Sequence, residues 1–458
     1  MSRLLTAIIL FAVCFPSSGT AQPLHKQFDY YFHMGKDQRD FLDTVQHRSF
    51  LYFLDHSDPD NGLVRDRSTA ESPASMAATG FGVVVWAIGA ENKWISRESA
   101  ALRTYRLLKF LLNSEQSFDP LATGYMGFYY HFVDMKTGRR VWNCELSSID
   151  TAWLIAGLLF ARQYYTERSS TETEIREMVA RVLDRIDWDW FTLKNGRDKG
   201  TISLGWTPGE AFHSKGWTGY NEALLLYIIA AGMGMDNYTD GYDKWVFQYR
   251  IAEPYEGLRH VWFPPMFGHQ YSHMFIDFRG LYDQYMSDAG LDYFENSRRA
   301  TLTQRLYAID NPLNWKGYDE NTWGLTACDG PGDSYNYEDQ KFNYYAARGT
   351  SGPGMSHDDD GTIAPTAAGG SVVFAPEICV PALQNFYDKY GFRGLWGEYG
   401  FKDAFNPTLD WYANDYLGID QAPFVIMIQN LKNSMVWRYT MKDPVISDGL
   451  RNLKFFYK

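Results

Sequence analysis

Carboxylates beside aromatic residues are the side chains of this sequence best suited to chemistry. Glu222 follows Trp217 and Tyr220 and stands directly before the apolar run 223–231. A run that is apolar on every side indicates a helix buried in a core, and this one is too short to cross a bilayer. We therefore expect Glu222 at the mouth of a buried helix, where desolvation raises the pKa of a carboxyl and the helix N-terminus lowers it.

Paired carboxylates across a cleft are what glycosidic hydrolysis requires. One protonates the leaving oxygen, and the other activates water or attacks carbon. Asp150 and Asp420 stand at predicted helix starts, where helix capping is as good an explanation as catalysis. The acidic candidates are more numerous than the reaction needs, and they are Glu145, Asp150, Glu210, Glu222, Asp277, Asp329, Asp403, Asp410, Asp415 and Asp420.

Other chemistries have weaker support in the sequence. It contains no GxxxxGK[ST] phosphate loop, no HExxH and no GxSxG nucleophile elbow. His269 and His273 are four residues apart and could bind a metal, but a histidine pair of the core or surface is the favoured interpretation. Residues 351–361, SGPGMSHDDDG, could hold Ca²⁺, but a solvated loop is favoured. We expect no metal and no cofactor.

Composition favours a carbohydrate over a charged polymer as the partner. The chain has 15 Trp, 32 Tyr and 30 Phe and a net charge of −12. Such an acidic protein suits neither nucleic acid nor the acidic polymers that lyases cleave. Sugar rings stack on aromatic surfaces, and several tryptophans fall in Gly-, Asp- and Asn-rich segments, namely Trp206, Trp217, Trp262, Trp323 and Trp411.

Apolar and amphipathic segments alternate along the chain, about twelve in all. The amphipathic segments are 40–57, 96–113, 171–191, 241–250, 291–308 and 376–390, and the apolar ones are 79–90, 147–165, 216–232, 272–285, 364–374 and 418–431. The simplest arrangement is an all-α, single-domain (α/α)6 barrel over 22–458, with apolar helices inside and amphipathic helices around them. All inner helices would then point the same way. Their N-terminal ends would form a rim of carboxylates and aromatics, with Asp150, Glu222, Asp277 and Asp420 among them.

Residues 1–21 have the pattern of a signal peptide. A basic Arg3 precedes the apolar stretch 4–15 and the small residues 19–21. This predicts a periplasmic or secreted protein, and the residues before Cys14 disfavour a lipoprotein anchor. No later run is long enough for a membrane span. The odd, sparse cysteines argue against a disulfide framework, although Cys144 and Cys328 could form a bridge.

Six motifs of the sequence resemble the glycoamylase-like domain family. They are SSIDTAWLIAGLLFARQYY, GWTGYNEALLLY, NTWGLTACDGP, DDGTIAPTAAGGSVVFAPE, YGFKDAFNP and YLGIDQAPFVIMIQN. The family includes the endo-β-1,2-glucanases of glycoside hydrolase family 144 and modules of cyclic β-1,2-glucan synthases. The resemblance runs over most of the chain after residue 21, with Ala422 where a glycine is expected.

This resemblance implies an (α/α)6 barrel and inverting hydrolysis of β-1,2-glucan (sophoran) to sophoro-oligosaccharides, without a metal. Glu222 matches the family carboxylate expected to act as the general acid. Asp415 matches the general base, with Asp410 as the second choice. Asp150 and Glu145 match an acidic cluster, and Asp150 is a further catalytic candidate. An inverting enzyme separates its two carboxyl groups by roughly 6.5–9.5 Å.

The remaining expectations concern substrate contacts and alternatives. Another glycosidase on this fold, such as a glucoamylase-type α-glucosidase, and an inactive glycan-binding protein stay open. We expect a monomer. The long Gly-rich loops 198–212 and 329–361 are expected to decide between endo and exo action. The residues predicted to contact substrate are Glu145, Trp206, Glu210, Trp217, Tyr220, Trp323, Asp329, Trp411 and Asp420.

Overall fold

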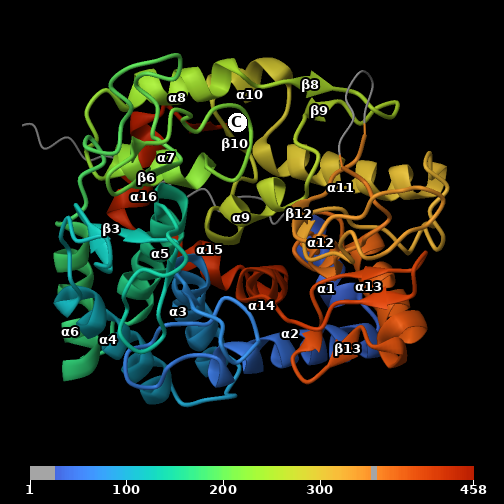
Figure 1. Cartoon of the computed structure of the whole chain (residues 1–458), viewed down its shortest axis with the longest axis horizontal. Coiled ribbons are helices and arrows are strands. Elements are labelled where there is room, and N and C mark those ends of the chain that lie inside the picture. Colours follow the sequence, from blue (N-terminus) through green and yellow to red (C-terminus); the bar gives the residue numbers. More distant parts are fainter. Residues whose placement is uncertain (1–25, 352–357) are drawn as a thin grey trace, which may run out of the picture.

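The computed structural model describes residues 26–351 and 358–458, and the chain is mostly helical (Figure 1). Six helices are largely apolar: α3 (Met76–Glu91), α5 (Ser148–Tyr164), α7 (Leu224–Gly232), α9 (Phe267–Phe275), α12 (Pro365–Gly369) and α14 (Gly418–Asn433). Six others alternate with them and lie towards the periphery: α2 (Lys36–Asp55), α4 (Arg97–Asn113), α6 (Ser170–Leu183), α8 (Tyr238–Phe247), α11 (Tyr293–Asp310) and α13 (Pro376–Tyr390). Short helices complete the chain: α1 (Lys26–His33), α10 (Gln284–Ala289), α15 (Met435–Thr440) and α16 (Pro444–Asn452).

Local sequence explains where these helices begin. Ser75 and Ser147 cap the inner helices α3 and α5, and Ser96 and Ser169 cap the outer helices α4 and α6, each by accepting a bond from a main-chain N–H of the first turn. The inner helices are buried on nearly all sides, whereas the outer helices bury one face. The resulting core is one continuous cluster of apolar side chains from Met34 to Leu453.

The six apolar helices contact one another in a closed order. Helix α3 packs against α5 and α14, α5 packs against α7, and α12 packs against α14. Two hydrogen bonds connect α9 to its neighbours α7 and α12 and so complete the order. The Leu225 N–H of α7 donates to Ser272 Oγ of α9 (3.1 Å), and Gln270 Nε2 of α9 donates to the Ala367 carbonyl of α12 (2.9 Å).

One predicted inner helix is displaced. The sequence pattern predicts it over 272–285, but α9 ends at Phe275 and the chain then turns before α10. Asp277 therefore follows the C-terminal end of α9 instead of preceding an inner helix, and it pairs with Arg279 (Nε–Oδ1 2.7 Å). The expectation that Asp277 joins the rim is wrong, because the apolar run was assigned one turn too late.

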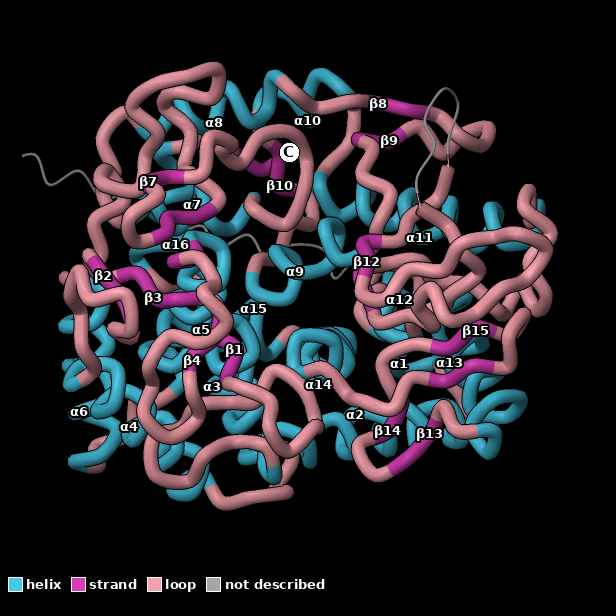
Figure 2. The backbone as a smooth tube through the Cα atoms, viewed as in Figure 1, coloured by secondary structure: helices cyan, strands magenta, loops and turns pink. Residues whose placement is uncertain are grey.

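Short strands occupy the loops, which the all-α prediction did not include. Most are two-residue antiparallel pairs, such as β1 (Ala74–Ser75) with β4 (Phe132–Val133), β11 (Ala327–Cys328) with β12 (Ala346–Ala347), and β10 (Leu281–Tyr282) with β17 (Phe456–Tyr457). One sheet has five strands in the order β2 (Gly124–Tyr125), β3 (Phe128–Tyr130), β5 (Leu146–Ser147), β6 (Gly205–Thr207) and β7 (Ala211–Phe212). Strand β5 runs directly into α5, and Figure 2 shows β2 and β3 beside that helix, so the sheet lies at its entry.

Three other predictions concern the signal peptide, membrane spans and a disulfide bond. The predicted signal peptide, 1–21, lies outside the described residues. Within the described residues, no helix has the length and apolar character needed to cross a membrane. Cys144, Cys328 and Cys379 carry free thiols, so a Cys144–Cys328 bridge is not formed.

Candidate active site

Glu222 lies two residues before α7, as the sequence predicts. Burial raises the pKa of its carboxyl to about 7, a hydrogen bond from its own main-chain N–H opposes this, and the charge of Asp150 adds to it. Among residues 26–351 and 358–458, no ion pair to the Glu222 carboxylate is found. A carboxyl that stays protonated near neutral pH can give its proton to a leaving group.

His131 bridges the two carboxylates expected near the start of α5. Its Nδ1 lies 2.9 Å from Glu145 Oε1 and its Nε2 lies 3.5 Å from Asp150 Oδ1. Burial alone would lower the pKa of His131, but the carboxylates of Asp150 and Glu145 raise it to about 9. The imidazole is therefore a cation at neutral pH, and its charge offsets part of the negative charge beside Glu222.

The same three side chains have the donor types of a metal site. Their nearest ligand atoms all lie within 4.8 Å of one another. However, the two imidazole nitrogens face different carboxylates, and metal binding needs a neutral imidazole. A charged bridge explains this geometry better than a ligand set.

A second acidic cluster gathers around Arg67, in the loop before α3. Arg67 Nη1 lies 3.1 Å from Asp329 Oδ2 and 3.6 Å from Asp415 Oδ2, and its Nε lies 3.4 Å from Asp66 Oδ2. Asp415 also accepts hydrogen bonds from Ser68 Oγ (2.9 Å) and Thr69 Oγ1 (2.6 Å).

Asp403 and Asp420 form a buried carboxyl pair within this second cluster. The Asp329 N–H donates to Asp403 Oδ2 (2.6 Å), whereas Asp403 Oδ1 and Asp420 Oδ2 are buried without a hydrogen-bond partner among the described residues. Burial and then the charge of Asp329 raise the pKa of Asp403 to about 7, and burial and Asp403 raise the pKa of Asp420 well above its ordinary value. Neighbouring carboxyls disfavour each other's charged form, so burial and mutual repulsion are the physical causes of both raised pKa values.

Tyr271, on α9, is subject to the charges of both Glu222 and this carboxyl pair. Burial raises the pKa of its phenol well above the ordinary value, and Asp420, Tyr345, Glu222 and Asp403 raise it further. A single hydroxyl that feels the charge of all three carboxyls links the two acidic clusters electrostatically.

Tyr345 reaches the carboxyl pair from the long loop 329–361. About half of its surface is exposed, yet burial at its hydroxyl end, followed by Asp420 and Asp403, raises the pKa of the phenol. An exposed ring with its hydroxyl at the carboxyls suits contact with a sugar.

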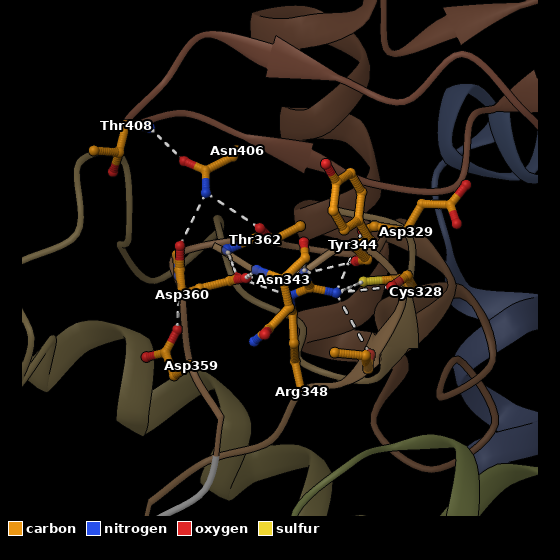
Figure 3. Close-up of polar contacts among 12 residues, drawn as sticks. Cys328, Asp329, Asn343, Tyr344, Arg348, Asp359, Asp360, Thr362, Asn406 and Thr408 are labelled. Carbon is orange, nitrogen blue, oxygen red and sulfur yellow. Dashed lines mark hydrogen bonds and ion pairs between the residues drawn. The ribbon is translucent and has the colours of Figure 1, made fainter. Parts of the chain in front are cut away.

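Arg348 anchors the loop that carries Tyr345 (Figure 3). Its fully buried guanidinium donates to both oxygens of Asp360 (2.7 and 2.9 Å) and to the carbonyls of Cys328, Asn343 and Tyr344 (2.7, 3.0 and 3.1 Å). Figure 3 shows the Asp329 side chain directed away from this cluster, which leaves it available to Arg67. Asp359 and Asp360 both accept bonds from protein donors, whereas residues 352–357 of the candidate Ca²⁺ loop lie outside the described residues.

The predicted site residues separate into two groups in the structure. Glu145, Asp150, Glu222, Asp329, Asp415 and Asp420 all belong to the two clusters described above. Glu210 is exposed in the turn between β6 and β7, and Asp410 forms an exposed ion pair with Arg393 (2.7 Å). Within the described residues neither contacts the other carboxylates, so position argues against the two as catalytic groups.

The predicted aromatic contacts differ in exposure. Trp206, Tyr220 and Trp323 are buried in the core, with 6, 5 and 1% of their surfaces exposed, and offer little to a sugar. Trp217 and Trp411 are half-buried, and Trp217 Nε1 donates to Ser148 Oγ (2.9 Å). His269 and His273 are core side chains bonded to the Phe263 carbonyl and to Ser297, as favoured from the sequence.

Sequence reasoning missed several groups at this site. Arg67, His131, Tyr271 and Tyr345 carry no local signal, because each acts through partners distant in sequence. Asp403 was not missed, because it is one of the ten acidic candidates of the sequence, but it was not among the residues predicted to form the site. Trp142, on the lip beside Glu145, is also new: its indole is 64% exposed, its φ is 56°, and it packs edge-on against Phe132.

Comparison with known proteins now places the chain. The Glycoamylase family model matches residues 214–444, which include Glu222, Tyr271, Asp403 and Asp420. The chain belongs to the glycoamylase family. A crystal structure from Bacteroides uniformis has a TM-score of 0.79 at 32% identity, and the match covers 93% of this chain and 99% of that one.

Two relatives of this glycoamylase-family chain have named activities. The endo-β-1,2-glucanase from Chitinophaga pinensis, solved with sophorotriose and glucose, has a TM-score of 0.78 at 27% identity, with 92% of this chain and 98% of that one covered. The exo β-1,2-glucooligosaccharide sophorohydrolase (non-reducing end) of Parabacteroides distasonis is 28% identical over 450 residues. That match covers 90% of this chain but only 57% of the relative, so this chain spans little more than half of its length.

Proposed function

We propose that this protein hydrolyses β-1,2-glucan to sophorose or sophoro-oligosaccharides. The observation that carries the proposal is that Glu222, Asp403 and Asp420 all have raised pKa values and all act electrostatically on one buried hydroxyl, that of Tyr271. The family membership and the β-1,2-glucan activities of its relatives supply the substrate class. The closed order of inner helices supports an (α/α)6 barrel in one domain as the scaffold.

In this mechanism Glu222 is the general acid. It gives its proton to the glycosidic oxygen as the bond from that oxygen to the anomeric carbon breaks. A water attacks the same carbon from the opposite face, and its proton passes to the anionic half of the Asp403–Asp420 pair. The product anomer is therefore inverted, and both carboxyl sites return to their starting states by exchange with solvent.

The general base proposed here differs from Asp415. Asp415 accepts bonds from Ser68 and Thr69 and pairs with Arg67, and these contacts occupy the lone pairs that a proton would need. The Asp403–Asp420 pair has raised pKa values and faces Tyr271, as Glu222 does. A base with a pKa near the working pH transfers protons most effectively.

The test is product analysis on two substrates. Purified protein should release reducing ends from linear β-1,2-glucan and none from starch. A ladder of oligomers over time would mean endo action, and one dominant disaccharide would mean release from a chain end. Products from starch alone would overturn the proposal in favour of an α-glucosidase, and detection of the first-formed anomer would test inversion.

We also propose that the glucan is met outside the cytoplasm. The signal-like pattern of residues 1–21 supports this. N-terminal sequencing of the protein after expression in a bacterial host should begin at Gln22. A chain that keeps Met1 and stays in the cytoplasm would contradict export while leaving the activity untouched.

A further inference from the structure

Helix α7, which follows Glu222, has no cap of its own. The residue before it is Ala223, whose side chain accepts nothing. The first N–H groups of any helix lack partners within that helix, and a serine, threonine, aspartate or asparagine usually supplies one from the same chain segment. Here the nearby Asn221 Oδ1 accepts only from the Ala223 N–H (3.0 Å), one residue too early to cap the helix.

Ser272, on the neighbouring helix α9, supplies the missing cap. Its Oγ accepts the Leu225 N–H of the first turn of α7 (3.1 Å) and donates its own hydrogen to the Glu222 carbonyl (2.9 Å). Ser272 is 2% exposed, so water does not compete for either bond. The Ser272 hydroxyl therefore bonds to the main chain at both ends of the segment from Glu222 to Leu225.

The main-chain bond matters because the Glu222 side chain has few restraints of its own. Its carboxylate has no ion pair within the described chain, so its direction follows from its backbone. The groups that face it are Asp150, from α5, and the Tyr271 hydroxyl, from α9. Tyr271 precedes Ser272 in sequence, so the same turn of α9 sets the positions of both Glu222 and Tyr271.

We propose that Ser272 is a positioning residue for Glu222, which it aims by capping α7 from the adjacent helix. The inference rests on the proposed role of Glu222 as the general acid. Gln270, two residues earlier, bonds to the carbonyl of Ala367 on α12 (2.9 Å), so residues 270–272 tie three inner helices together. A small displacement of a catalytic group costs about 100-fold in rate.

The test compares two substrates whose leaving groups differ in how much they need protonation by an acid. Hydrolysis of β-1,2-glucan needs a proton on the leaving oxygen, whereas a sophorosyl fluoride expels fluoride with little help from an acid. Ser272→Ala should lower kcat on the glucan about 10- to 100-fold, with KM unchanged within about twofold. It should lower the rate on the fluoride far less, and Ser272→Thr, which keeps the hydroxyl, should recover much of the lost kcat.

Ser49→Ala is the matched control, because Ser49 is a fully buried helical serine on α2 whose hydroxyl has no partner in the described part of the chain. It should leave both rates unchanged. Equal losses of Ser272→Ala on both substrates, or no loss on either, would overturn the inference. If Ser272→Ala does not fold, Ser272→Cys, whose thiol is a weak donor, should give the same selective loss.

Glu222→Gln separates this inference from the proposed function. If Glu222→Gln keeps full activity on the glucan, the proposed acid is wrong and the role of Ser272 falls with it. If Glu222→Gln is inactive while Ser272→Ala behaves as wild type, the acid stands and only the positioning role is rejected.

Discussion

The two carboxyl sites that face Tyr271 reach a raised pKa by different routes. Glu222 is alone: burial does most of the work, and no cation within the described residues pairs with it. Asp403 and Asp420 are crowded: each is raised by burial and by other carboxylates, and Arg67 stands nearby as a counter-ion to Asp329 and Asp415. A solitary desolvated carboxyl tends to hold its proton, whereas a carboxyl of raised pKa in a crowded pair can accept one, which suits an acid and a base respectively.

Removing the solitary carboxyl should have the largest effect. Glu222→Gln keeps the size of the side chain but cannot give a proton, so kcat on β-1,2-glucan should fall by at least about 10³-fold. Initial rates of reducing-end release would measure this. Glu256→Gln, in an exposed loop, is the control and should keep full activity. A mild loss for Glu222→Gln would mean that another carboxyl protonates the leaving group.

Splitting the carboxyl pair should have the next largest effect. Asp403→Asn and Asp420→Asn each remove the ability of the pair to take a proton, so kcat should fall about 10²- to 10⁴-fold. Asp415→Asn should cost less, because Asp415 is proposed to hold Arg67 and not the proton. Steady-state kinetics of the three variants identify the general base. If Asp415→Asn is inactive while the Asp403 and Asp420 variants stay active, Asp415 is the base.

Removing the Arg67 guanidinium should shift the pH dependence of the base, Asp403–Asp420, and leave that of the acid, Glu222, unchanged. Arg67 lowers the pKa of Asp403, so Arg67→Met should raise it further, and the base will then be protonated at a higher pH. The acidic limb of the kcat profile should shift to higher pH, while the alkaline limb, set by Glu222 with its pKa of about 7, should stay. Arg393→Met, which breaks an exposed ion pair, is the control for charge removal. Movement of both limbs would contradict separate control of acid and base.

Whether a feature of the two carboxyl sites can be predicted from the sequence depends on how far apart in the chain its interacting residues lie. Glu222 and the nine apolar residues after it are a local pattern, so its place before α7 could be predicted. Asp150 and Asp420 stand at helix starts for the same reason. The alternation of apolar and amphipathic segments likewise located nearly all of the twelve helices, although α9 was shifted because its apolar run continues past Phe275 into the chain after it.

The crowded side could not be predicted in the same way. Arg67 meets Asp329, and Asp403 meets Asp420, only because distant loops converge at the ends of the inner helices. Burial of Trp323 is also set by tertiary packing, so a tryptophan in a loop-like segment was expected to face substrate and instead lies in the core. Local composition gives the type of a residue and its element, but not the partner that decides its charge.

The His131 imidazolium, which pairs with Asp150 and Glu145, should contribute to the stability of the fold as well as to charge balance near Glu222. The pKa of His131 is raised to about 9 by Asp150 and Glu145 and is about 6.5 in an unfolded chain. This contribution is therefore complete below about pH 6.5 and is lost as the pH rises through 9. His131→Gln should lower the free energy of unfolding by about 1–2 kcal/mol at pH 6, allowing for solvent at the partly exposed ring.

Urea unfolding at pH 6 and at pH 9.5 measures this difference, which should nearly vanish at the higher pH. His47→Gln is an informative control, because burial lowers the pKa of His47 and its difference from wild type should change with pH in the opposite sense. A His131→Gln deficit that is the same at both pH values would show that packing, not the charged bridge, stabilises this side of the site.

The outer lip of the Glu222 side should give the smallest effect. Trp142 is exposed and has a left-handed backbone, a conformation that bulky residues rarely adopt without a reason. Its indole packs against Phe132, whose ring stacks on the His131 imidazole, so it extends the site outwards from the charged bridge.

Trp142→Ala should raise KM for long β-1,2-glucan about two- to tenfold, because a stacked ring contributes about 0.5–1.5 kcal/mol, and should leave kcat and the KM of the shortest substrate unchanged. Kinetics over a series of chain lengths would measure this, and glucan should quench the indole fluorescence of the wild type more than that of the variant. Phe392→Ala, which removes an exposed ring from the short helix η1 (Gly391–Arg393), is the matched control. An equal rise in KM at every chain length would mean that Trp142 supports the Glu145–His131–Asp150 bridge instead of binding the distal sugars.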